Sequence, residues 1–141
     1  MKTEEIMIGD WITGPDLEPR RVVAILNFDE MQVEKEPNSD NWITYNIIEA
    51  EPIPLLPWML EKAGFKPFSK DAHQLFEHEF WVHENEGRGK FKLWHSSGRW
   101  FVQHYSRDGL TNISMPLPTG SVHELQHLLR ICGIELDMNI H

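Results

Sequence analysis

The first 50 residues alternate short apolar runs with turn-forming residues. Runs 6–12, 21–28 and 42–48 are rich in Ile, Val and aromatic residues, and 31–35 alternates apolar with polar positions. Short runs at this spacing, separated by Gly, Pro, Asn and Asp, predict antiparallel strands of a small barrel or sandwich. We therefore expect residues 1–50 to form a small all-β lobe, either an SH3-like β-barrel or a curled sheet.

A proline-rich stretch follows this lobe. Three prolines within residues 51–57 remove backbone donors and fix φ, which excludes a helix or an inner strand. We expect 51–56 to be an ordered connector between two lobes. Pro57 suits the first position of a helix and Gly64 suits its C-terminal cap, so residues 57–63 are predicted to form a short helix.

The second half of the chain has the pattern of an antiparallel meander. Four runs of strand-forming residues are separated by polar or glycine-containing turns, with a hairpin turn at 96–99. The predicted strands are 74–83, 90–95, 100–105 and 110–115.

The clearest local signal is a C-terminal helix over 121–132. Ser121 and Glu124 have the spacing of a capping box, and Gly133 suits the C-terminal cap. An apolar stripe at helical spacing should face the sheet. Its members are Val122, Leu125, Leu128, Leu129 and Cys132. We therefore expect an α+β protein in which residues 57–141 form an antiparallel sheet with two helices.

The composition limits which classes of protein this chain can belong to. A chain of 141 residues with 40% hydrophobic and 25% charged residues fits one globular domain or two small ones. Cys132 is the only cysteine, which excludes an internal disulfide. Residues 1–6 lack the apolar stretch of a secretory signal, and no run reaches the roughly 20 apolar residues of a membrane span. We expect a cytoplasmic protein without a membrane partner.

The net charge of −9 is concentrated in the first half. Residues 1–65 carry 5 Lys/Arg and 13 Asp/Glu, a net of −8, whereas residues 66–141 carry 8 and 9, a net of −1. Because an acidic surface repels phosphate groups, we expect no binding to duplex nucleic acid. The same charge keeps a small protein soluble.

Residues 123–127 read His-Glu-x-x-His, the spacing found in zinc-dependent hydrolases. Two imidazoles one helical turn apart can bind zinc, and the intervening carboxylate can accept a proton from the bound water. The enzyme alternative is therefore a zinc-dependent hydrolase with His123 and His127 as metal ligands and Glu124 as the catalytic base.

Several features favour a structural role for this motif. Glu124 already has a place in the capping box, and both histidines lie opposite the apolar stripe. A catalytic zinc also needs a third protein ligand, for which the downstream candidates are Glu135 and His141. We expect a solvated helix face, with no catalytic residue, no metal ligand and no cofactor.

A second candidate site is one face of the predicted hairpin. Lys90, Lys92 and Trp94 alternate onto this face, and Tyr105 lies on the opposing strand. Aromatic rings between cations can stack on bases and neutralise phosphates. The alternative is an amphipathic outer sheet face on which lysine stems cover the rings. These four residues form the candidate weak binding face.

Five short segments follow one another along the chain: Ile8–Ile12, Glu51–Leu55, Leu60–Phe65, Val122–Gln126 and Gly133–Leu136. In this order they resemble a group of small uncharacterised bacterial proteins, many encoded by phages or prophages. The group has no established activity, so the resemblance implies no catalytic residue. Similar proteins have Val-His-x-Leu-Gln in this helix, with other residues at the positions of Glu124 and His127, which suits packing better than zinc binding.

The function we expect is that of a non-enzymatic accessory or binding protein, and the resemblance implies a phage origin. Its partner would be a protein or a small ligand. The enzyme alternative is the zinc hydrolase described above. A third alternative is a small-ligand binder with a pocket between the lobes, lined by some of the six tryptophans.

Overall fold

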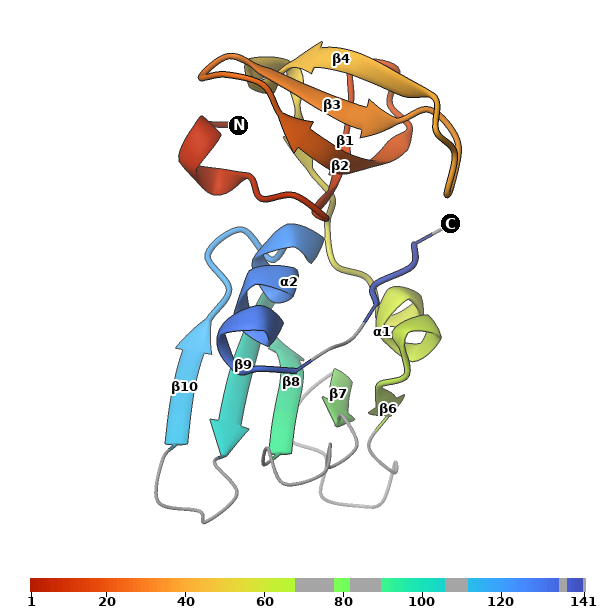
Figure 1. The fold of residues 1–141 in the computed structure, drawn as a ribbon. Helices are drawn as coiled ribbons and strands as arrows, with labels where there is room; N and C mark the ends of the chain where they lie inside the picture. Colours follow the sequence, from red (N-terminus) through yellow and green to blue (C-terminus); the bar gives the residue numbers. More distant parts are fainter. Residues whose placement is uncertain (68–77, 82–89, 106–111, 135–136, 141) are drawn as a thin grey trace. The chain divides into compact units, whose positions relative to one another are not determined.

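The computed structural model shows an α+β protein whose described residues form two α-helices and two antiparallel sheets (Figure 1). The residues described are 1–67, 78–81, 90–105, 112–134 and 137–140. Within them the chain forms two compact units, which we call unit 1 and unit 2. Unit 1 comprises Met1–Pro54, Ser121–His123 and Ile140, and unit 2 comprises Leu55–Gly120 and Glu124–Asn139.

Unit 1 contains a five-stranded antiparallel sheet in the order β4-β3-β2-β1-β5. Its strands are β1 (Trp11–Thr13), β2 (Pro19–Ile25), β3 (Glu30–Glu34), β4 (Trp42–Asn46) and β5 (Glu51–Pro52). Each strand pairs with its neighbour along the chain except β5, which returns to pair with β1. The outermost strands of this order are not paired with each other in the described part of the chain, so the sheet is open.

The core of unit 1 follows from the alternation of strand residues. Met31 and Val33 of β3 are fully buried, while the intervening Gln32 is half-buried. The same core takes one or two apolar side chains from each of β1, β2 and β4, together with residues flanking the strands. Its buried members are Ile6, Ile12, Val22, Met31, Val33, Tyr45, Ile47 and Ala50.

Two predicted strands of unit 1 differ from the structure at their ends. Only the end of the run 6–12 is a strand, because the buried carboxylate of Asp10 accepts a hydrogen bond from the Met7 N–H at 2.7 Å and closes a turn. At the other end of the sheet, β4 stops at Asn46, and Ile47–Glu49 form the single-turn 3-10 helix η2. A similar turn, η1, spans Thr3–Glu5.

The proline-rich run enters the sheet before the first helix begins. Glu51 and Pro52 pair with β1 at the sheet edge, where a missing proline N–H is tolerated. The helix α1 spans Pro57–Ala63, with Pro57 in its first turn as predicted. Gly64 ends it at φ +102°, a left-handed conformation that glycine adopts readily.

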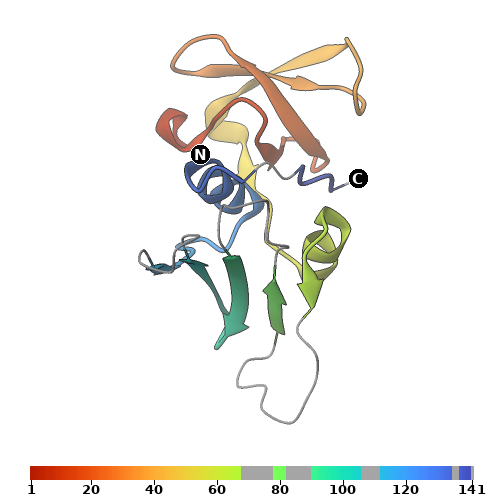
Figure 2. The same cartoon turned by 60° about the horizontal axis from the view of Figure 1, so that its bottom comes forward.

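Unit 2 contains the second five-stranded antiparallel sheet, in the order β10-β9-β8-β7-β6. The strands are β6 (Lys66–Pro67), β7 (His78–Trp81), β8 (Lys90–Ser96), β9 (Arg99–Tyr105) and β10 (Asn112–Pro116). The predicted hairpin is confirmed, since β8 and β9 pair along their full length around Ser97 and Gly98, both at positive φ. Figure 2 shows α1 leading directly into β6, beside β7.

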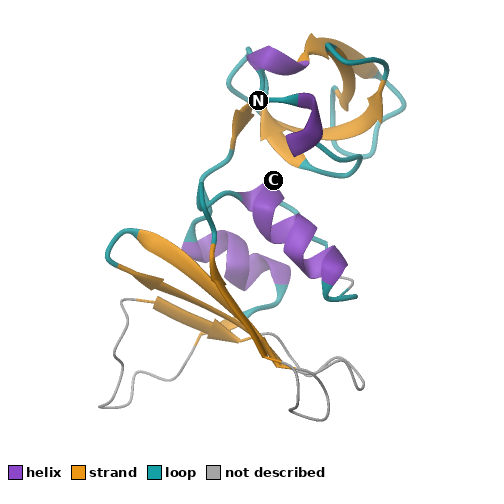
Figure 3. Ribbon diagram, turned by 90° about the vertical axis from the view of Figure 1, so that its left-hand side faces the viewer, coloured by secondary structure: helices purple, strands orange, loops and turns teal. Residues whose placement is uncertain are grey.

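The helix α2 spans Val122–Ile131, close to the predicted range, and lies over one face of the second sheet (Figures 1 and 3). On that face Phe91 and Phe65 meet edge to face, with ring centroids 6.3 Å apart. Among the described residues, the buried apolar side chains of unit 2 are Leu55, Met59, Leu60, Phe65, Phe91, Leu93, Trp100, Val102, Leu117, Leu125, Leu129, Ile134 and Met138. No helix among the described residues has the length and apolar character needed to cross a membrane.

Candidate functional site

The His-Glu-x-x-His residues lie in the first two turns of α2. The side chain of His123 is only 5% exposed, and its Nδ1 lies 3.0 Å from the hydroxyl oxygen of Ser121. The expectation of a solvated helix face is therefore wrong for His123, whereas His127 is half-buried. The prediction rested on the position of His123 around the helix axis, which is opposite the apolar stripe. A helix can be buried on more than one side, so this position does not imply exposure.

The carboxylate of Glu124 binds the loop that precedes α2. Its Oε1 accepts hydrogen bonds from the Thr119 backbone N–H at 2.9 Å and from the Thr119 hydroxyl. This is a capping interaction two residues earlier than the expected partner, Ser121. Among the described residues no three His, Cys, Asp or Glu side chains come together as a metal site. The downstream candidates Glu135 and His141 lie outside the described residues.

The candidate weak binding face is assembled on β8 and β9. The Trp94 and Phe101 rings stack across the two strands at 5.5 Å with an angle of 13° between their planes. The ammonium of Lys92 lies 5.4 Å from the Trp94 ring centroid, within the range of a cation–π contact. Lys90 and Tyr105 are paired positions in the backbone register of the same two strands.

The tryptophans are divided between core and surface. Trp11 and Trp100 are buried, and the Trp100 indole N–H donates to the Leu55 carbonyl at 3.0 Å. Trp42 and Trp58 are about half exposed, at 54% and 47%. Trp94 is half-buried, and the side chain of Trp81 lies outside the described part.

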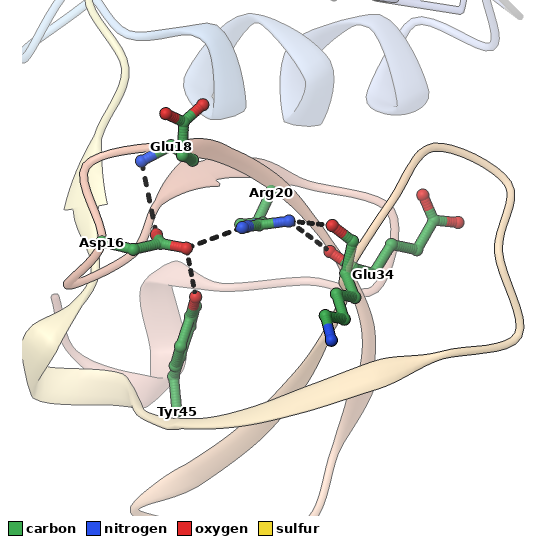
Figure 4. Close-up of polar contacts among 6 residues, drawn as sticks. Asp16, Glu18, Arg20, Glu34 and Tyr45 are labelled. Carbon is green, nitrogen blue, oxygen red and sulfur yellow. Dashed lines mark hydrogen bonds and ion pairs between the residues drawn. The ribbon is translucent and has the colours of Figure 1, made fainter.

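A polar network in unit 1 was not anticipated from the sequence (Figure 4). Asp16 Oδ2 accepts hydrogen bonds from the Arg20 guanidinium at 2.7 Å and from the Tyr45 hydroxyl at 2.9 Å. Arg20 also donates to the backbone carbonyls of Glu34 and Lys35. The network ties the turn between β1 and β2 to β3 and β4.

The network shifts the pKa of its members in opposite directions. Burial acts to raise the pKa of the Asp16 carboxyl, but hydrogen bonds from Arg20, Tyr45 and the Glu18 N–H outweigh it, so the pKa lies below its ordinary value. Burial and the hydrogen bond to Asp16 raise the pKa of the Tyr45 phenol. No sequence signal pairs Asp16 with Tyr45, because the turn that brings them together depends on the tertiary fold.

A hollow of about 520 Å³ opens on the surface of unit 1. Three segments line it: residues 1–4, residues 28–29 and residues 46–48. Two large apolar side chains at its border are almost fully exposed, Phe28 at 85% and Ile48 at 81%. The lining also carries the charged residues Lys2, Glu4 and Asp29.

No protein-family model, curated protein or solved structure matches this chain. Its function is therefore inferred from the geometry of its own residues.

Proposed function

We propose that the protein is a non-enzymatic binding module that takes a basic protein segment at the hollow of unit 1. The exposure of Phe28 and Ile48 beside this hollow carries the proposal. A single exposed apolar side chain is ordinary on a protein surface. Two large ones at the border of one concavity, with polar residues around them, are typical of an interaction site.

Charge selects the kind of segment that would bind. Unit 1 contains 4 Lys/Arg and 12 Asp/Glu, a net of −8. The side chains that line the hollow include two carboxylates and one ammonium, and the neighbouring Glu5 and Glu49 are exposed. A partner segment with several Lys or Arg residues and one large apolar anchor would complement both properties.

We also propose that the open sheet of unit 1 is an SH3-like curled sheet. Its support is topological: five short antiparallel strands follow one another in order, and β1 pairs with both β2 and β5. Such a sheet is a rigid frame for loops, and the hollow is lined by the segments that join or flank its strands.

The contacts of the His-Glu-x-x-His motif support the non-enzymatic proposal. A zinc hydrolase would need the Glu124 carboxylate free to accept a proton from bound water. That carboxylate accepts two hydrogen bonds from Thr119 instead.

The proposal can be tested with a library of random 12-residue peptides displayed on phage. Selection against the immobilised full-length protein should enrich peptides with a net positive charge and at least one large apolar residue. Replacing Phe28 and Ile48 together by Ser should weaken the binding of the selected peptides at least tenfold. The anchor positions are exposed, so the fold should survive, and a thermal melt checks this.

A matched control is Leu17→Ser, which removes another highly exposed apolar side chain of unit 1, at 82% exposure, outside the hollow. This variant should bind the selected peptides as the wild type does. Selection of acidic peptides, or peptides that bind the Phe28/Ile48 variant equally well, would show that the hollow is not the binding site.

A further inference from the structure

The outer face of the second sheet combines aromatic and basic residues in the described part of the chain. In an antiparallel sheet, directly opposed residues lie on the same face. One row of opposed residues therefore crosses all five strands of this sheet. The row runs Lys66, Trp81, Lys92, Gln103 and Ser114. The next row along the strands runs Glu79, Trp94, Phe101 and Pro116.

This face is the one that α2 does not cover. Leu93 and Val102, which alternate onto the other face, are buried, whereas Lys92, Trp94, Phe101 and Gln103 are only half-buried. Figure 3 shows the sheet with α2 on one side and no helix of the described part on the other. An outward sheet face is ordinarily polar, so an aromatic pair at its centre is unusual and suggests a binding role.

Positive charge gathers on this face although the protein is acidic. Among the residues that the structure describes, the strand register assigns four basic residues to this face, Lys66, Lys90, Lys92 and Arg99, and one acidic residue, Glu79. Lys66 and Arg99 are exposed. These five described positions sum to +3, in contrast with the net charge of −9 for the whole chain. Such a patch attracts anions even when the protein as a whole repels them.

We infer that this face binds single-stranded nucleic acid. Bases add to the end of the stack that Trp94 and Phe101 already form, and the phosphates lie near Lys92 and its neighbouring cations. Stacking on aromatic side chains combined with backbone neutralisation is the ordinary mode of sequence-tolerant single-strand binding. A duplex cannot use the rings, because its bases are already stacked on one another. A neutral sugar would use the rings but would not account for the cations. The inference does not depend on the hollow of unit 1.

The probe for the test is a 20-nucleotide oligothymidylate labelled with fluorescein, titrated with the full-length protein by fluorescence anisotropy. The expected Kd is roughly 1–100 µM at physiological salt, the range of non-specific nucleic-acid binding. About three phosphate contacts give a slope near −2 in a plot of log K against log salt concentration. Stacking should also quench the intrinsic tryptophan fluorescence.

Two variants separate stacking from charge. Trp94→Ala should weaken binding roughly 5- to 100-fold, since it removes one stacking platform. Lys92→Gln should weaken it less and reduce the magnitude of the salt slope by about 0.7. If Trp94→Ala does not fold, Lys92→Gln still tests the inference. Circular dichroism checks the folding of both variants.

Matched controls come from α1, which carries an exposed Trp58 and an exposed Lys62 in the same unit. Trp58→Ala and Lys62→Gln should bind the oligonucleotide as the wild type does. The inference fails if the oligonucleotide does not bind at 20 mM salt, or if the two β8 variants bind as tightly as the wild type. It also fails if polyphosphate of equal charge, or a duplex of equal length, competes as well as the single strand.

Discussion

At the residue scale, Gly14 occupies a position where no side chain fits. A Cβ atom added there would lie 2.3 Å from Cε2 of Tyr45, well inside van der Waals contact. Gly14→Ala should therefore displace the Tyr45 ring and lower the free energy of unfolding by about 1–3 kcal/mol, the usual effect of overpacking. Urea denaturation monitored by circular dichroism measures this loss.

The collision with Tyr45 makes the effect of Gly14→Ala depend on that ring. In a Tyr45→Ala background the ring is absent, so the added methyl group should cost much less than in the wild type. If the two changes lower the free energy of unfolding additively, close packing against Tyr45 is not the reason for glycine at position 14.

The lowered pKa of Asp16 predicts an acid-sensitive contribution to stability. A carboxyl whose pKa is lower in the folded state stabilises the fold above its ordinary pKa of about 3.9, and this stabilisation is lost as pH falls through the lowered value. The Asp16 side chain is 36% exposed, so solvent screening limits the effect to about 1 kcal/mol or less. Asp16→Asn should lower the free energy of unfolding at pH 7, and the difference from wild type should shrink below pH 3.

Thermal melts of both proteins from pH 2 to pH 7 measure this difference. Tyr45→Phe serves as a partial control, because it removes one of the hydrogen bonds that lower the Asp16 pKa. Its pH profile should lie between those of the wild type and Asp16→Asn. Parallel profiles for the wild type and Asp16→Asn would contradict the role given to this network.

At the scale of elements, the sequence predicted correctly those helix ends and turns that depend only on neighbouring residues. The helix α1 begins at Pro57 and ends at Gly64 as predicted, since both caps are set by backbone preferences of single residues. The β8–β9 hairpin also follows from its own turn. The strand predicted over residues 6–12 was wrong over most of its length. The buried Asp10 carboxylate accepts a hydrogen bond from the Met7 N–H there, a contact that hydrophobic alternation does not reveal.

The start of α2 offers a test of the zinc alternative. Because Glu124 holds the Thr119 loop, Glu124→Ala should lower the free energy of unfolding by about 0.5–1.5 kcal/mol, the usual net effect of losing hydrogen bonds. The loss should be the same with and without a chelator. Thr119→Val removes one of the same hydrogen bonds and should have a smaller effect of the same sign.

A bound metal would produce a different pattern. Metal binding to the native state adds to its stability, so a chelator would lower the wild-type melting temperature. His123→Ala and His127→Ala would then each abolish that response. Both results together would contradict a purely structural role for the His-Glu-x-x-His motif and would support the zinc hydrolase alternative.

At the scale of the whole molecule, charge is distributed unequally between the units. Unit 1 has a net charge of −8, and the net of −9 for the chain leaves −1 for the rest. We expect no submicromolar binding to random-sequence duplex DNA at 150 mM salt, because duplex binding needs clustered cations over many phosphates. An electrophoretic mobility shift measures this, and tight salt-sensitive binding would contradict it.

The two candidate sites differ in how far the sequence could predict them. The basic and aromatic face arises from alternation along two adjacent strands, so counting positions placed Lys90, Lys92 and Trp94 together. The hollow of unit 1 is lined by three segments far apart in sequence, and none of them has a recognisable motif. Sites of the second kind depend on tertiary contacts, which no local pattern encodes.

Unit 1 is not continuous along the chain, and this affects the order in which the protein can fold during synthesis. Pro54 forms a β-bridge with Ser121, and the Val122 N–H donates to the Ile53 carbonyl at 2.9 Å. These contacts cannot form until most of unit 2 has been translated, although β1 to β5 emerge first. A nascent chain therefore carries an incomplete first unit for much of its synthesis, when unpaired edges favour misassembly. A gene fragment that ends after Pro54 would encode that vulnerable intermediate and not a finished domain.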